Sequence, residues 1–247
     1  MAGKQKHEEG LEPLEELESL AERSARWVLE HAWLSLGALA ALLLGTAAWA
    51  GWSSWASGRE QAASEALEAV RASYLAAMGA EPGSLEVPEL ANPKAAQQIR
   101  SEYAQRFREL AEARQGTASA PLAWLEAGLL ARENGDPAAA LEALQAGLAA
   151  ARPGSPLRGV LLEREGQLHE QAGRWEEAAR AHLAASEIER YPLRLWALAD
   201  AARCFDAASD PARARELLEQ VEAEAPGLPL PDHLRSRLRE LRALSAS

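Results

Sequence analysis

One uninterrupted apolar stretch near the N-terminus dominates the pattern of hydrophobic and polar positions along the chain. From Ala32 to Gly58 the sequence contains no Asp, Glu, Lys, Arg or His. A helix rises by about 1.5 Å per residue, so this stretch would be about 40 Å long, compared with about 30 Å for the hydrocarbon core of a bilayer. The pattern therefore predicts a single transmembrane helix over residues 32–58.

Tryptophan residues bracket the apolar stretch. Indole rings favour the membrane interface, where their apolar body and their N–H donor are both satisfied. A cleaved signal peptide is the alternative, because Ala48-Trp49-Ala50 resembles a cleavage site, but the region before the stretch is too long and too acidic for a signal. We therefore expect five tryptophans at the membrane interface: Trp27, Trp33, Trp49, Trp52 and Trp55.

Small residues recur at four-residue spacing inside the predicted membrane helix. Gly37, Ala41 and Gly45 would lie on one ridge, and such ridges let a second membrane helix approach closely. The stretch is rich in alanine, so a ridge of this kind is also expected by chance. Packing of another helix against it is a hypothesis.

Residues 1–31 form an acidic tail in front of the apolar stretch. From Pro13, apolar residues such as Leu14, Leu17 and Leu20 recur at helical spacing between glutamates, which predicts an amphipathic helix. This helix would either lie on the membrane surface or dock onto a partner.

Lysine and arginine are unevenly distributed around the apolar stretch. Lys4, Lys6, Arg23 and Arg26 precede it, whereas its far flank carries only Arg59 and Arg71 before residue 80. Basic residues favour the cytoplasmic side of a membrane. We expect the N-terminus in the cytoplasm and the C-terminal domain across the membrane, in the periplasm if the cell is a Gram-negative bacterium with the anchor in its inner membrane.

The helical pattern continues beyond the apolar stretch. Residues 59–79 and 94–114 each carry an apolar stripe at helical spacing, and the segment Glu81–Pro93, with three prolines, separates them. We expect a stalk helix and a first antiparallel helical hairpin within residues 59–118.

Three similar units follow over residues 119–230. The pattern Trp124, Gly128, Gly135, Ala140 and Leu144 returns 38 residues later with identical offsets, and a looser third copy lies 36 residues further on. Each copy is predicted to be a helix, a tight turn and a helix. Asp232–Leu244, rich in arginine, is predicted to be a capping helix within residues 231–247.

Glycines mark two kinds of position in these units. Gly135 and Gly173 follow a predicted helix, where a left-handed residue is needed. Gly128 and Gly166 lie inside a helix, where glycine costs about 1 kcal/mol relative to alanine. Close approach of the neighbouring helix would explain the second kind, with Ala140, Ala178 and Ala214 as its expected contacts.

The pattern resembles the tetratricopeptide repeat, which has Trp, Gly, Gly and Ala at these offsets. The whole layout, including the segments Leu125–Ala131 and Ala140–Leu148, is similar to the ancillary subunit of the bacterial Sec translocon (the YfgM-like family). The resemblance implies an all-α fold with one N-terminal transmembrane helix and an α-solenoid of helical hairpins. It implies protein partners, namely translocon subunits, a periplasmic chaperone or client polypeptides.

In this repeat class the first helix of each unit lines a concave surface that binds a partner. The alternative is that several of the residues at these offsets only pack against the preceding hairpin. The implied partner-binding residues are Leu122, Leu125, Leu129, Arg132, Val160, Glu163, Gln167, Glu170, Trp196, Arg203 and Asp206.

Composition narrows the range of functions. A net charge of −11 argues against nucleic acid, and the single cysteine, Cys204, excludes an internal disulfide and is expected to be buried. His169 and His182 fall at packing positions and are expected to face each other across the second hairpin; a metal-binding or pH-sensing pair is the alternative.

No motif for an enzyme, a metal, a cofactor or a small-molecule substrate is recognisable in the sequence. Together with this absence, the resemblance implies a membrane-anchored scaffold ancillary to the Sec translocon and the periplasmic chaperone network. The alternative is a structural subunit of another cell-envelope complex, in which the acidic tail and the basic terminal helix make the contacts.

Overall fold

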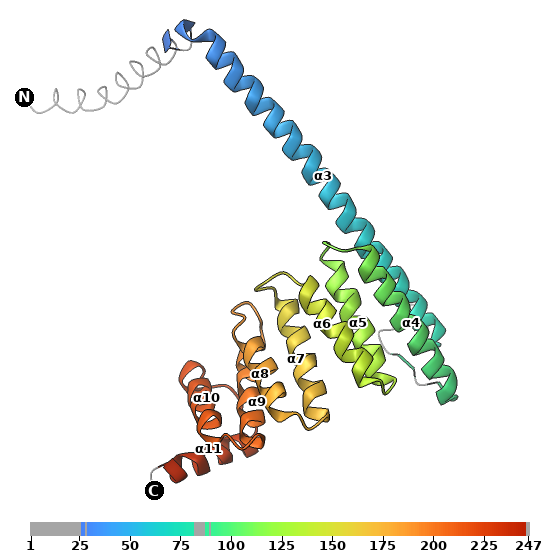
Figure 1. Cartoon of the computed structure of the whole chain (residues 1–247), viewed down its shortest axis with the longest axis vertical. Coiled ribbons are helices and arrows are strands. Elements are labelled where there is room, and N and C mark those ends of the chain that lie inside the picture. The colour runs from blue at the N-terminus through green and yellow to red at the C-terminus, as the bar shows by residue number, and fades with distance from the viewer. Residues whose placement is uncertain (1–25, 28, 82–86, 89, 246–247) are drawn as a thin grey trace, which may run out of the picture. The chain divides into compact units, whose positions relative to one another are not determined.

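The computed structural model describes residues 26–27, 29–81, 87–88 and 90–245, and these residues form helices and connecting turns without a strand (Figure 1). The predicted all-α class with a series of helical hairpins is confirmed for these residues. The predicted amphipathic helix of the tail lies outside the described residues. The chain divides into two units, residues 1–58 and residues 59–247.

Within the first unit, the described residues belong mainly to the first part of helix α3 (Ala32–Ala77). This helix is long and apolar enough to cross a membrane, and none of its most apolar window is buried within the chain. Length and composition alone do not distinguish a membrane span from a signal sequence or from a helix of a soluble protein. Membrane insertion is therefore taken up below as a proposal.

In the second unit, the end of α3 packs against α4 (Pro93–Ala113). The Tyr103 hydroxyl of α4 donates a hydrogen bond to the Ser73 carbonyl of α3 at 2.9 Å, and the Arg59 guanidinium donates to the Gln115 carbonyl at 3.0 Å. The start of α3 in this unit thus lies beside the end of α4, so the two helices are antiparallel. Phe107 is buried at their contact.

Helical hairpins follow one another through the rest of the unit, and each helix packs against the next in the chain (Figure 1). Their alanine-rich faces are buried, which allows the helices to approach closely. The helices are α5 (Ser119–Glu133), α6 (Pro137–Ala150), α7 (Pro156–Gln171), α8 (Trp175–Ser186), α9 (Arg194–Ala207), α10 (Pro211–Glu224) and α11 (Asp232–Ser245).

The turn inside each of the three repeats has the same backbone geometry. Gly135 and Gly173 have φ angles of +77° and +70°, as predicted, and Ser209 has a φ of +67° at the equivalent position of the third repeat. The side chains of Asp136 and Asp210 then cap the second helix by accepting a hydrogen bond from a backbone N–H. The third repeat therefore keeps the turn although it lacks the glycine.

Close approach at the glycines inside the helices is confirmed, and the nearest contacts include a larger side chain than the alanines expected. A Cβ atom on Gly128 would lie 3.1 Å from the side chain of Leu144 and 3.3 Å from the Ala140 carbonyl. A Cβ atom on Gly166 would lie 2.6 Å from the ring of His182, whose atoms are its nearest neighbours. The large residue one turn beyond each alanine reaches across the hairpin, so it makes the main contact.

We predict that Ser209→Gly stabilises the chain by about 1 kcal/mol, because glycine adopts a left-handed conformation without the steric cost that a Cβ atom imposes. The free energy of unfolding in urea is the measurement. Ser209→Ala is the matched control, since it keeps the Cβ atom and should give no gain. Equal stability of the glycine and alanine variants would contradict the prediction.

Candidate functional site: a groove above a buried ionic cluster

A groove of about 580 Å³ lies between α7 and α9 in the second and third repeats. Its apolar lining comes from Val160 of α7 and from Leu193 and Trp196 at the start of α9. Leu193 is 51% exposed, so its apolar surface is accessible at the edge of the groove. The polar lining comes from Glu163, Arg164, Gln167 and Asp200.

Tyr191 forms one wall of the groove, and its place depends on a glycine in α7. The Tyr191 ring is so close to Gly159 that a Cβ atom there would lie 2.5 Å from it. The Tyr191 hydroxyl donates a hydrogen bond to Glu163 Oε2 at 2.9 Å. Gly159 therefore lets the segment between α8 and α9 pack directly onto α7.

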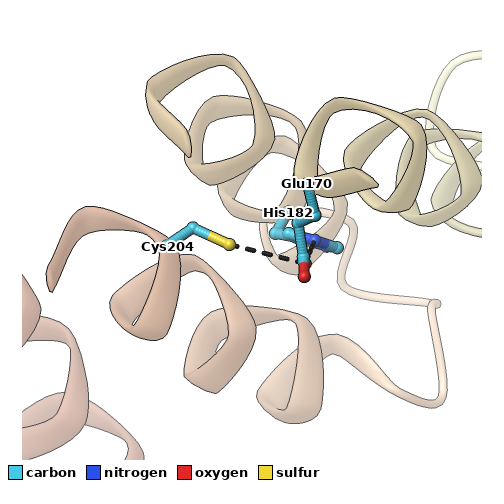
Figure 2. Close-up of side chains that lie close together, drawn as sticks. All are labelled: Glu170, His182 and Cys204. Carbon is cyan, nitrogen blue, oxygen red and sulfur yellow. Dashed lines mark hydrogen bonds and ion pairs between the residues drawn. The ribbon is translucent and has the colours of Figure 1, made fainter. Parts of the chain in front are cut away.

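Below the groove, charged and polar side chains from three helices converge on Glu170 of α7 (Figure 2). The Glu170 Oε1 atom is 2.8 Å from His182 Nε2 of α8, 2.7 Å from Arg203 Nη2 of α9 and 3.4 Å from Cys204 Sγ of α9. His182 Nδ1 lies 3.4 Å from Glu163 Oε1, within ion-pair distance but without a hydrogen bond. His182 and Cys204 are 1% and 0% exposed, so a polar cluster occupies the core of the second and third repeats.

The contacts within the cluster shift the pKa values of its members in consistent directions. Burial by itself would raise the pKa of Glu170, but the hydrogen bonds from His182 and Arg203 outweigh it and lower the pKa to about 2. Burial would likewise lower the pKa of His182, but Cys204 and the carboxylates of Glu163 and Glu170 raise it above its ordinary value. Burial raises the pKa of the Cys204 thiol. The cluster thus favours an imidazolium between carboxylates.

The sequence-predicted partner-binding residues fall into three environments, all half-buried. Val160, Glu163, Gln167 and Trp196 line the groove, as the repeat offsets imply for a shared surface. Glu170 and Arg203 pair with each other in the cluster, and Asp206 accepts two hydrogen bonds from Arg237 of α11 at 2.8 and 2.9 Å. The residues of the cluster and Asp206 are therefore engaged within the chain.

The predicted partner-binding residues of the first repeat do not line the groove. Leu122 and Leu125 pack beside two different core clusters, and Leu129 lines a separate pocket next to Tyr74 and Arg100. Arg132 is half-buried in the last turn of α5. These positions fit the alternative that some residues at the repeat offsets pack against a neighbouring hairpin.

Sequence reasoning missed Tyr191 and Asp200 in the groove, and it did not foresee carboxylate partners for His182. Glu163 and Glu170 are far from His182 along the chain, and only the hairpin brings them close. His169, by contrast, accepts a hydrogen bond from Arg174 at 3.0 Å. The glutamates were detectable as partner-binding candidates, because they share one face of α7 at helical spacing.

The residues predicted to contact a membrane lie in the first unit and are exposed. Trp33 and Trp49 are 87% and 73% exposed, and Trp27, Trp52 and Trp55 are also exposed. A Cβ atom on Gly37 or Gly45 would meet nothing within 4 Å, and Ala41 is exposed. The small-residue ridge is therefore uncovered within the described chain.

Comparisons with known proteins add a fold likeness. No family model matches the chain, and the curated proteins contain no match. Two solved structures of a candidate kinesin light chain with nearly identical TPR-like repeats from Podosopora anserina, one of them carrying a point substitution, are similar with a TM-score of 0.41 and 19% identity. For the substituted form, the likeness covers 62% of this chain and 94% of the other chain. For the form without the substitution, it covers 64% of this chain and 98% of the other chain. Likeness at this level does not identify a function.

We predict that His182 makes the stability of the chain depend on pH. The pKa of His182 is higher in the folded chain than in the unfolded chain, so its contribution is complete below about pH 6.5 and decreases as the pH rises. Between about pH 6.5 and 8, the free energy of unfolding of the wild type should fall by up to about 1.4 kcal/mol per pH unit.

His182→Leu should lack this decrease, because leucine has no proton to lose. Urea unfolding in buffers containing EDTA measures both chains over the same pH range. The ring faces Glu163, Glu170, Arg203 and Cys204, and these groups are present in both chains. Parallel pH curves for the two chains would contradict the prediction.

Proposed function

We propose that the chain is a single-pass membrane scaffold whose helical hairpins bind a protein partner in the periplasm. The proposal rests on two features of the chain. Residues 32–58 form an apolar helix that is not covered within the chain, and an amphipathic groove lies between α7 and α9. The helix would hold the groove at the inner membrane, and the groove would take a segment of the partner. The chain would have no catalytic role.

The exposed apolar surface of the first unit supports the membrane anchor. Leu42, Leu43 and Leu44 are 63%, 60% and 71% exposed, and their neighbours are uncharged. Exposed apolar surface of this extent is unfavourable in water and favourable in lipid. The tryptophans at both ends of the stretch would lie in the headgroup region.

The groove supports a peptide-binding role. It combines an aromatic residue, Trp196, and an exposed Leu193 with the carboxylates of Glu163 and Asp200. Apolar anchors of this kind supply most of the binding energy in protein interfaces, and charged groups at their edge fix orientation. A partner segment with an apolar and a basic side chain would complement this lining.

We assign the partner to the Sec translocon and the periplasmic chaperone network. This assignment rests on the resemblance in layout, namely a short cytoplasmic tail, one anchor and periplasmic tetratricopeptide-like repeats. In this position the groove would hold a translocon subunit, a chaperone or an emerging client polypeptide. The N-terminal tail would remain in the cytoplasm.

A structural subunit of another envelope complex is the alternative, with the basic helix α11 as a contact surface. Contacts within the chain weaken this alternative. Arg237 pairs with Asp206, and Arg242 pairs with Glu219 and Glu222 of α10 at 3.3 and 2.9 Å. The charges of these two arginines are therefore already paired within the chain.

We predict that Leu43→Arg shifts the chain from the membrane fraction to the soluble fraction. An arginine at the centre of a membrane helix costs about 2.5 to 3.5 kcal/mol on insertion scales. Carbonate extraction of bacterial membranes measures the distribution, and Leu43→Ala is the matched control that should stay in the pellet. A wild-type chain that is extracted by carbonate would contradict the anchor.

Orientation is tested separately by adding protease to spheroplasts. A periplasmic C-terminal domain should be degraded while the spheroplasts are intact. Resistance of this domain until the membrane is broken would contradict the proposed orientation.

We predict that Trp196→Ala weakens partner capture by about tenfold or more, as expected for an aromatic anchor worth at least about 1.4 kcal/mol. The measurement is photo-crosslinking from a probe at the exposed position Leu193, followed by quantification of the captured protein. Trp175→Ala is the matched control, because Trp175 is an exposed tryptophan of α8 outside the groove lining.

Circular dichroism of both tryptophan variants checks that the helices are retained. Equal crosslinking in the two variants would contradict the groove as the binding site. Capture of proteins that are not translocon subunits, chaperones or clients would favour the alternative complex.

A further inference from the structure

The polar cluster under the groove occupies a place that the repeat itself fills with leucine. His182 is the counterpart of Leu144 in the first repeat and of Leu218 in the third, and both leucines are buried. An apolar residue therefore satisfies the packing of this fold at that position. A histidine, a thiol and a carboxylate in the same core need a reason beyond packing, because buried polar groups are costly.

The three groups come from three consecutive helices and point toward one another (Figure 2). A ring nitrogen of His182, the thiol of Cys204 and a carboxylate oxygen of Glu170 all lie within 4.8 Å of each other. Within the described residues, these three side chains form a group whose residue types and spacing could hold a metal ion. Two of the three side chains, His182 and Cys204, are fully buried.

From this arrangement, we propose that Glu170, His182 and Cys204 bind one Zn²⁺ ion. Thiolate, imidazole and carboxylate are the ligands that zinc prefers, at about 2.0 to 2.3 Å. Ligand atoms in such a tetrahedral site lie about 3.4 Å apart. The Sγ–Oε1 distance of 3.4 Å already fits, and the Nε2–Oε1 distance of 2.8 Å needs to lengthen by a fraction of an ångström.

The carboxylate next to the other ring nitrogen of His182 is a second observation that favours a metal. Nδ1 of this buried ring has no hydrogen-bond partner, although Glu163 Oε1 is 3.4 Å away. A zinc-bound histidine typically directs its other N–H at a carboxylate, which fixes the tautomer and the orientation of the ring. With zinc on Nε2, the Nδ1–H would face Glu163, so Glu163 would be a positioning residue.

Charge balance permits the exchange of protons for zinc. Without metal, the cluster pairs an imidazolium and a neutral thiol with the Glu170 carboxylate. Binding of Zn²⁺ releases one proton from the imidazolium and one from the thiol, so two positive charges leave and two arrive. The net charge of the buried cluster is unchanged, and Arg203 can stay on the Glu170 carboxylate and on Asp200.

Zinc at this position would connect α7, α8 and α9 beneath the groove. The three ligands leave a fourth position for a water molecule. His182 and Cys204 are buried, so the ion would lie in the core between the helices. The ion would hold the second hairpin against the third, independently of any membrane or partner binding.

The experiment uses the full chain in a mild detergent after removal of metal with a chelator. Titration with Co²⁺ as a spectroscopic substitute should give one ion per chain, with a thiolate-to-cobalt charge-transfer band and tetrahedral visible bands. Zn²⁺ should displace Co²⁺ and raise the melting temperature. Binding should tighten as the pH rises, since protons are released.

Variants assign the ligands. Cys204→Ser should abolish the charge-transfer band, and His182→Leu should abolish stoichiometric binding while keeping the residue type of the other repeats. Glu163→Gln should weaken affinity by about 10- to 100-fold. His169→Gln is the matched control, because His169 belongs to the same repeat but not to the cluster, and it should bind like the wild type.

The folded wild-type chain decides the proposal even where a variant fails to fold. Absence of the thiolate–cobalt band at excess metal would overturn it and leave a hydrogen-bonded ion cluster. Equal zinc stabilisation of the wild type and His182→Leu would also overturn it. Neither result touches the membrane or partner assays, so the two proposals succeed or fail separately.

Discussion

Close approach between the two helices of each hairpin is the constraint on which the rest of the repeat domain depends. A small residue inside the first helix leaves room for a large residue of the second helix, as Gly128 does for Leu144 and Gly166 for His182. The glycine costs about 1 kcal/mol of helix propensity, and the contact of a buried side chain offsets it. Because alanines line the remaining faces, the hairpins stack with their backbones close together.

The second repeat uses this geometry for a different chemistry. The His182 ring lies so close to Gly166 that even a methyl group would displace it. The same crossing brings the ring to Glu170 on one side and Glu163 on the other, while Cys204 arrives from the next hairpin. The cluster therefore belongs to the junction of two repeats and not to one repeat alone.

Much of the fold could be predicted because its determinants are local in the sequence. Gly135 and Gly173 mark turns that need a left-handed residue, and the repeat offsets place the hairpins. Ser209 shows the limit of this reasoning, since a turn capped by Asp210 keeps its geometry without glycine. Residue type alone does not reveal which turns tolerate that strain.

The candidate site could be predicted only in part, because its chemistry depends on contacts between helices. The spacing of Val160 and Gln167 puts them on the face of α7 that lines the groove, whereas Tyr191 enters the site through a contact with α7 that no local pattern indicates.

The free-energy cost of burying the ionic cluster is relevant to its role in the molecule. Replacing a buried ion pair by apolar residues of similar volume is often neutral or stabilising, and the neighbouring repeats already have Leu144 and Leu218 there. Stability of the fold therefore does not require His182. His182 does, however, lie beside Glu163, with 3.4 Å between Nδ1 and Oε1, and Glu163 accepts the hydrogen bond of the Tyr191 hydroxyl through its other carboxylate oxygen. The buried cluster and the wall of the groove thus meet at one side chain, Glu163.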